Sequence, residues 1–162
     1  MTTMSPTATD RSVRLPSARA LYVAVYGVCV LLPLAVFVGS ILFTDEDPYK
    51  DMGAVESIVT IGIISTVALA ISLGVVALTR ATPERAKIGA VTLAALSVPT
   101  IVVFWSGTPG ILAAGAATLS GITRGGRPLA GAGRVAGIVG VFVAALSIVL
   151  TIGAYTVSWI AE

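Results

Sequence analysis

Long stretches without a charged residue make up most of the chain, and polar residues gather in short segments between them. A helix rises about 1.5 Å per residue and the hydrocarbon core of a bilayer is about 30 Å thick, so roughly 20 apolar residues cross it. The pattern therefore predicts an all-α, polytopic transmembrane helix bundle. The expected spans are residues 18–44, 57–79, 88–105, 109–123 and 135–159.

The third and fourth spans come from one uncharged run, 88–123. As a single helix this run would measure about 54 Å, nearly twice the hydrocarbon thickness. The turn-forming sequence SGTPG at 106–110 divides it into two arms. The second arm, 109–123, would reach only about 22 Å. A re-entrant segment, or a bundle of four spans, therefore stays open beside the expected five.

Residues 1–17 are rich in Ser, Thr, Pro and Arg and have no apolar period. We expect a disordered tail there, followed by a single transmembrane bundle over 18–161. A cleaved signal peptide is the competing interpretation of the first apolar stretch, but its apolar region would have only about 7 to 15 residues. We also expect Pro33 and Pro99 to kink their helices.

Basic residues predict the orientation, because nine of the ten fall in three clusters, at 11–19, 80–87 and 124–134. The positive-inside rule places all three clusters in the cytoplasm, which requires an even number of crossings between Lys87 and Arg124. The N-terminus is then cytoplasmic, and the acidic loop and the C-terminus are outside. The residues expected to set this topology and contact lipid head groups are Arg80, Arg85, Lys87, Arg124, Arg127 and Arg134. Aromatic residues expected at the outer interface are Phe43, Tyr49, Trp105, Tyr155 and Trp159.

Composition supports a membrane protein and removes most enzyme classes. The 162 residues are 56% hydrophobic and 11% charged, with a net charge of +2. There is no His, Asn or Gln, and the single cysteine is Cys29. Catalytic triads, imidazole-ligated metals and amide oxyanion donors therefore lack their usual groups. We expect no enzymatic activity, no cofactor, no metal site and no nucleic-acid partner.

Two motifs match ligand-binding patterns only in part. Gly131–Ala136 follows GxGxxA, but a dinucleotide site needs a preceding strand and an acid about 20 residues later. The acids at 45, 47, 51 and 56 fit a calcium-loop count, yet Tyr49 and Lys50 stand where an oxygen ligand and the turn glycine belong. We interpret the first as a helix-packing motif and the second as an outer acidic loop.

Small residues recur on one face of the last span, where their spacing lets helix backbones approach closely. This predicted packing face consists of Gly133, Ala136, Gly137, Gly140 and Ala144. Its partner helix can belong to the same chain, to another copy or to another protein. Hydroxyl side chains offer a second pattern, a polar seam, although such groups mostly bond to their own helix. The seam would consist of Thr60, Ser65, Thr66, Ser72, Thr92, Ser97, Thr100, Ser147 and Thr151.

The second half of the chain partly repeats the first. Leu78–Arg80 is followed by Ile122–Arg124, and Ala94–Ser97 by Ala144–Ser147, which indicates two tandem hairpins or a chance match. Residues 110–155 contain a Gly/Ala-rich arm, an Arg-Gly-Gly-Arg turn and a helix that opens GAGRVAGIVG. This region resembles the small two-span membrane hairpin domains of unknown function that are common in actinobacterial proteins. The resemblance implies a hairpin fold and provides no activity.

Two functional hypotheses remain. The first is a structural or interaction subunit of the bacterial inner membrane, embedded in the lipid bilayer, whose small-residue faces pack against another membrane protein or against itself. The second is a small transporter or channel component with a Ser/Thr-lined seam. Intramembrane acids, bases or histidines normally mark ion pathways, and none lies deep in the expected spans.

Overall fold

The computed structural model describes residues 15–43 and 53–160, and this part of the chain is helical without a β-strand. It confirms the predicted all-α class. The elements are α1 (Ala18–Tyr26), a π-helical turn (Gly27–Leu31), α2 (Leu32–Phe43), α3 (Ala54–Thr79), α4 (Pro83–Ser97), a 3-10 helix (Pro99–Ser106), α5 (Thr108–Leu119) and α6 (Ala132–Ile160).

Local sequence signals explain where α1 and α4 begin. The Ser17 side chain accepts a hydrogen bond from the Ala20 backbone N–H at 3.2 Å, and so satisfies one of the free donors at the start of α1. Thr82 caps α4 in the same way, and Pro83 occupies the first helical position, where its missing N–H costs nothing. Helix α4 therefore begins before the uncharged run that predicted it.

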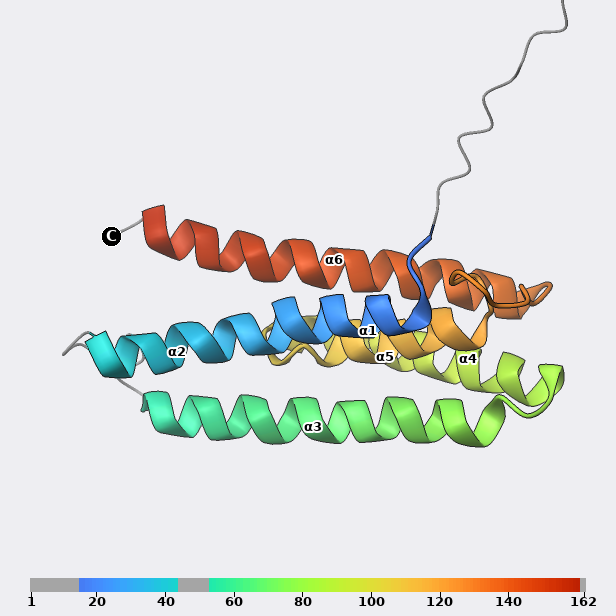
Figure 1. The fold of residues 1–162 in the computed structure, drawn as a ribbon, viewed down its shortest axis with the longest axis horizontal. Coiled ribbons are helices and arrows are strands. Elements are labelled where there is room, and N and C mark those ends of the chain that lie inside the picture. The colour runs from blue at the N-terminus through green and yellow to red at the C-terminus, as the bar shows by residue number, and fades with distance from the viewer. Residues whose placement is uncertain (1–14, 44–52, 161–162) are drawn as a thin grey trace, which may run out of the picture.

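Three long rods lie side by side in the bundle, and the shorter α4 and α5 fill the space between them at one end (Figure 1). The rods are α3, α6 and the first span, in which α1, the π-helical turn and α2 follow one another. Helices α4 and α5 run in opposite directions, and both have their outer ends where α3 finishes and α6 starts (Figure 1). Together they form a helical hairpin whose turn points into the bundle.

Contacts of the hairpin turn show how far it reaches. A Cβ atom on Gly107 would lie 2.7 Å from Val30 Cγ2, and one on Gly110 would lie 3.2 Å from Ser147 Cβ. Val30 is twelve residues into the first span, about 18 Å from its start, and Ser147 is near the midpoint of α6. The hairpin turn therefore lies near the middle of the bundle.

Helix lengths do not support the expected five spans. Within the described residues, three helices are long and apolar enough to cross a membrane: Ala18–Gly39, Val55–Thr79 and Ala132–Val157. Helix α4 and the 3-10 helix make a fourth only if they cross as one span bent by 71°. Helix α5, expected to span over 109–123, has 12 residues and reaches about 18 Å, well below the hydrocarbon thickness.

Both predicted proline kinks coincide with irregular helix. The 71° bend falls at the break between Ser97 and Pro99. In the first span the π-helical turn ends two residues before Pro33, and the Leu32 N–H bonds to the Gly27 carbonyl, five residues back. Pro33 has no N–H to offer the Cys29 carbonyl, so the regular pattern is interrupted at this point.

Candidate functional site

Helix α5 is the structural centre of the molecule. Its buried residues are Pro109, Gly110, Ile111, Leu112, Ala113, Ala114, Gly115, Ala116, Ala117 and Leu119, which is ten of the twelve in the helix. It contacts α1, α3, α4 and α6. A helix that is apolar on all sides must be covered by other elements or by lipid, and here protein covers it. The candidate site is therefore α5 together with the hairpin turn that precedes it.

The hairpin turn fits against the irregular part of the first span. Gly107 has φ +68°, a left-handed conformation that favours glycine, and it ends the 3-10 helix. A Cβ here would also lie 3.1 Å from the Cys29 carbonyl oxygen. The Cys29 carbonyl, to which Pro33 offers no N–H, thus lies beside the turn, and the close fit allows no side chain between them.

Hydroxyl groups of the turn are satisfied locally. The Ser106 hydroxyl bonds to the Val103 carbonyl and to the Thr108 hydroxyl, each at 2.8 Å. In the described part of the chain, no buried side-chain nitrogen or oxygen lacks a hydrogen-bond partner. The turn therefore has no unpaired buried side-chain group that would require a bound ligand or ion.

A chain of hydrogen bonds ties α5 to α1 and α3. The Tyr22 and Ser72 hydroxyls are 2.7 Å apart, and the Ser72 hydroxyl donates to the Ile111 carbonyl at 3.1 Å. This is possible because Gly115 leaves room: a Cβ there would lie 3.0 Å from the Tyr22 hydroxyl oxygen and 2.7 Å from Leu93 Cδ1. Three helices are thus linked by polar groups inside an apolar bundle, where such bonds have little competition from water.

The predicted packing face of α6 lies mostly against α5, and at its start Gly133 lies beside Leu129 and Lys87. All five of its residues are buried: Gly133, Ala136, Gly137, Gly140 and Ala144. A Cβ on Gly140 would lie 2.6 Å from the Ala113 carbonyl oxygen and 3.0 Å from the Ala117 nitrogen, and one on Gly137 would collide with the Ser120 side chain. Of the three partners left open by the sequence, the structure therefore places a helix of the same chain on this face.

The predicted polar seam is divided between the interior and the surface. Ser65, Ser72, Ser97, Ser147 and Thr151 are buried, whereas Thr66 and Thr92 are exposed and Thr60 and Thr100 are partly buried. The buried hydroxyls other than that of Ser72 bond to carbonyls of their own helix. The structure therefore does not bring the nine side chains together along one path.

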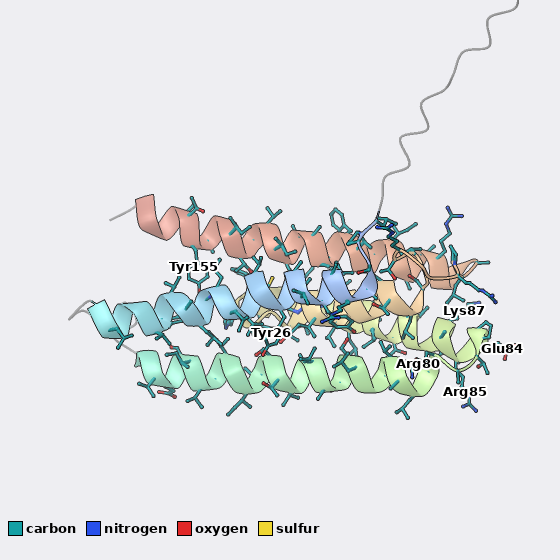
Figure 2. The ribbon with its side chains drawn as sticks, viewed as in Figure 1. Tyr26, Arg80, Glu84, Arg85, Lys87 and Tyr155 are labelled. Atoms are coloured by element: carbon teal, nitrogen blue, oxygen red, sulfur yellow. The ribbon has the colours of Figure 1, made fainter. Side chains whose placement is uncertain are left out.

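Basic residues of the second and third clusters are all exposed. Figure 2 shows Arg80, Arg85 and Lys87 together with Glu84 at the end of the bundle where α3 meets α4. The third cluster lies in the α5–α6 connection and the first turn of α6. The connection folds back on itself, because the Leu129 N–H bonds to the Ser120 carbonyl at 2.9 Å. The members of this cluster are Arg124, Arg127 and Arg134.

The two ligand-like motifs have different outcomes. In the segment Gly131–Ala136, Gly131 precedes α6 and the other residues form the first helical turn, and no strand precedes them among the described residues. The acids at 45, 47 and 51 lie outside the described residues. Glu56 is exposed in the first turn of α3, where the helix dipole favours an acid. In the part of the chain that is described, no three His, Cys, Asp or Glu residues are grouped as metal ligands.

Comparison with known proteins adds no family assignment, because no protein family, no curated protein and no solved structure matches the chain.

Two features of the site were missed in the sequence. The Tyr22–Ser72 bond had one available signal, since a tyrosine within an apolar helix needs a partner for its hydroxyl. The contact between Gly107 and the π-helical turn had no signal in the sequence, because it joins segments about 80 residues apart.

Proposed function

We propose that the chain crosses the membrane three times and that α4 and α5 form a re-entrant hairpin entering from the cytoplasmic side. The position of the hairpin turn near the middle of the bundle supports this topology. Zero crossings then separate Lys87 from Arg124, so the even number required by the positive-inside rule is kept. The N-terminus remains cytoplasmic and the C-terminus outside, in a bacterial plasma membrane. Trp105, beside the turn, then lies at mid-membrane depth and not at the outer interface.

Thiol labelling on intact cells tests this topology. Single cysteines are introduced at Tyr49, Trp105, Gly126 and Glu162 in a Cys29→Ser background and probed with a membrane-impermeant reagent. We expect labelling at Tyr49 and Glu162 only, because Trp105 is inside the membrane and Gly126 is cytoplasmic. Labelling at Trp105 would restore the outward loop of a five-span bundle and contradict the hairpin.

Within this topology, the function that the geometry supports best is that of a structural or interaction subunit without enzymatic activity. The observation that carries it is the closed packing around α5, where glycines at 110, 115, 137 and 140 allow contacts with no room for an added Cβ. Charged residues of the described spans lie at or near helix ends. A filled core with satisfied hydroxyls suits a rigid membrane module better than a solute path.

Because the small-residue face of α6 is used inside the chain, a partner would bind elsewhere on the bundle. Photo-cross-linking residues placed singly at exposed positions of three elements test this: Ala70 in α3, Val102 in the 3-10 helix and Ile152 in α6. A protein adduct, from another membrane protein or a second copy, at one position but not at the others supports an interaction subunit. Lipid adducts alone at all three positions would contradict it.

One observation favours transport as a second candidate. Helices that break and return at membrane depth line substrate sites in many transporters, and here the 3-10 helix, Gly107 and α5 form such a break. Transport predicts that Ser106→Ala and Thr108→Val variants change ion efflux from proteoliposomes. Equal efflux from empty vesicles and from vesicles containing the wild-type protein would remove this candidate.

A further inference from the structure

A shallow groove lies on the outer surface of α4, near the end where the basic residues gather. It has a volume of about 400 Å³ and is lined by Glu84, Lys87, Ile88, Val91 and Thr92. These residues recur at intervals of three and four, so they share one face of the helix. Ile88 is 66% exposed and Val91 is 40% exposed, so the groove opens away from the bundle.

The charged end of the groove holds one acid and one base. Side chains three positions apart on a helix are close enough to pair, yet neither Glu84 nor Lys87 forms an ion pair with another described residue. The Lys87 side chain runs beside α6, where its Cγ would be 3.4 Å from a Cβ on Gly133. Both charges are therefore free to bind a ligand that carries one charge of each sign.

The order of groups along α4 matches the order of groups in a phospholipid. Glu84 is in the first turn of α4. Measured along the helix axis from Glu84, Lys87 lies about 4.5 Å further on and Val91 lies about 10 Å further on. In a phosphatidylethanolamine, the ammonium lies furthest from the hydrocarbon, the phosphate is next and the acyl chain is deepest. The same direction along α4 leads from acid to base to apolar side chains.

We propose that this groove binds a phospholipid with a primary ammonium, of the phosphatidylethanolamine class. Its ammonium donates hydrogen bonds to Glu84, Lys87 binds the phosphate, and one acyl chain lies on Ile88 and Val91, with the Thr92 hydroxyl alongside. A choline head group fits less well because it has no N–H to donate and no aromatic side chain lines the groove. An anionic head group without an amine would face the Glu84 carboxylate.

The inference rests on the proposed topology only in that the start of α4 must lie at a membrane interface. The thiol-labelling experiment tests the topology independently of any bound lipid. A lipid result can therefore fail while the topology holds.

Lipid retention measured by native mass spectrometry tests the groove. The protein is reconstituted in nanodiscs with equal amounts of phosphatidylethanolamine, phosphatidylglycerol and phosphatidylcholine, then released and analysed with its bound lipid. We expect phosphatidylethanolamine to be retained preferentially. Lys87→Gln should lower its retention about fivefold, since a base near the lipid surface contributes about 1 kcal/mol. Glu84→Gln should abolish the preference for phosphatidylethanolamine over phosphatidylglycerol.

Arg85→Gln is the matched control, because Arg85 is exposed on α4, carries the same charge as Lys87 and does not line the groove. We expect Arg85→Gln to change lipid retention less than about twofold. A twofold change corresponds to less than half of the binding free energy that one base near the lipid surface contributes. Equal losses in Lys87→Gln and Arg85→Gln would overturn the proposal in favour of general attraction to charge. Preferential retention of phosphatidylglycerol by the wild type, or equal competition by glycerophosphoethanolamine without acyl chains, would also overturn it.

Discussion

Helices α3 and α6 both carry small residues at intervals of four, but only those of α6 are covered by protein. The α6 face is in contact with α5, and an added methyl group at Gly140 would meet backbone atoms. On α3, a comparable row is formed by Gly62, Thr66, Ala70 and Gly74, which we call the open stripe. A Cβ added at Gly62 or Gly74 would meet no atom within 4 Å.

The difference arises from α5, which is itself rich in Gly and Ala. Two helices approach closely only where both lack bulky side chains, and α5 offers Ala113 and Ala117 to Gly140. Helix α3 instead presents another face to α5, with Ser65, Ala68 and Ser72 buried. The spacing of small residues therefore indicates that close packing is possible. The neighbouring helix decides where it happens.

The largest expected effect comes from placing a leucine on the packing face of α6, compared with a leucine on the open stripe of α3. Gly140→Leu forces a side chain into the α5 backbone and should destabilise the protein by about 3 kcal/mol or more, because backbone atoms cannot move aside as side chains do. Gly62→Leu on the open stripe should change stability by less than about 0.5 kcal/mol. Unfolding of both variants in mixed detergent and SDS micelles measures the contrast. Equal effects would mean that α5 does not cover the α6 face.

The sequence predicted the long rods well because charged residues bracket them. Residues 57–79 and 135–159 were expected to be helical, and both lie within α3 (Ala54–Thr79) and α6 (Ala132–Ile160). The start of α4 was predicted too late, because the expected span began at residue 88 and the helix begins at Pro83. Glu84, Arg85 and Lys87 were excluded from the span as charged, although Thr82 and Pro83 form a recognisable helix start.

The depth of the hairpin could not be predicted, because the charge rule is satisfied equally by two crossings and by none. The end of α5 was also placed too late. Ser120–Thr123 are uncharged and were expected to be helical, but Gly121 has φ +70° and the chain turns there.

The α6 packing face was predicted as a face for helix contact, whereas its partner depends on contacts across the whole bundle. The tandem-hairpin interpretation also pairs α3 with α5, two helices of 26 and 12 residues.

The hairpin turn allows a second test, of how the turn before α5 is held against the first span. Gly107→Ala places a side chain in a left-handed conformation and pushes it toward Val30, so we expect a loss of about 2 kcal/mol. Gly153→Ala is the control, since Gly153 is exposed in α6 and its Cβ would meet nothing within 4 Å. Thermal unfolding followed by size-exclusion chromatography compares the two. A Gly107→Ala variant as stable as the control would indicate that the turn is not packed on the first span.

A smaller effect is expected from the polar link between α3 and the interior. Tyr22→Phe removes the hydroxyl that bonds to Ser72 and should cost about 1 kcal/mol, the usual range for a hydrogen bond between membrane helices. Tyr26→Phe, one turn later in the first span, is the matched control, because no hydrogen bond of the Tyr26 hydroxyl is present in the described structure. The same SDS titration measures both. The Tyr22–Ser72 link would be unimportant if the two variants lost equal stability.

The smallest effect concerns the open stripe, where alanine replaces glycine. Gly62→Ala and Gly74→Ala add a methyl group that meets no protein atom, and they reduce the freedom of the unfolded backbone. We expect each to leave stability unchanged or to raise it by up to about 1 kcal/mol, whereas Gly140→Ala should lower it because its Cβ would be 2.6 Å from the Ala113 carbonyl oxygen. Unfolding should be measured in detergent and again in native membranes. A loss of stability that occurs only in membranes would show that another helix covers the open stripe there. The open stripe of α3 and the packing face of α6 would then both be covered by protein.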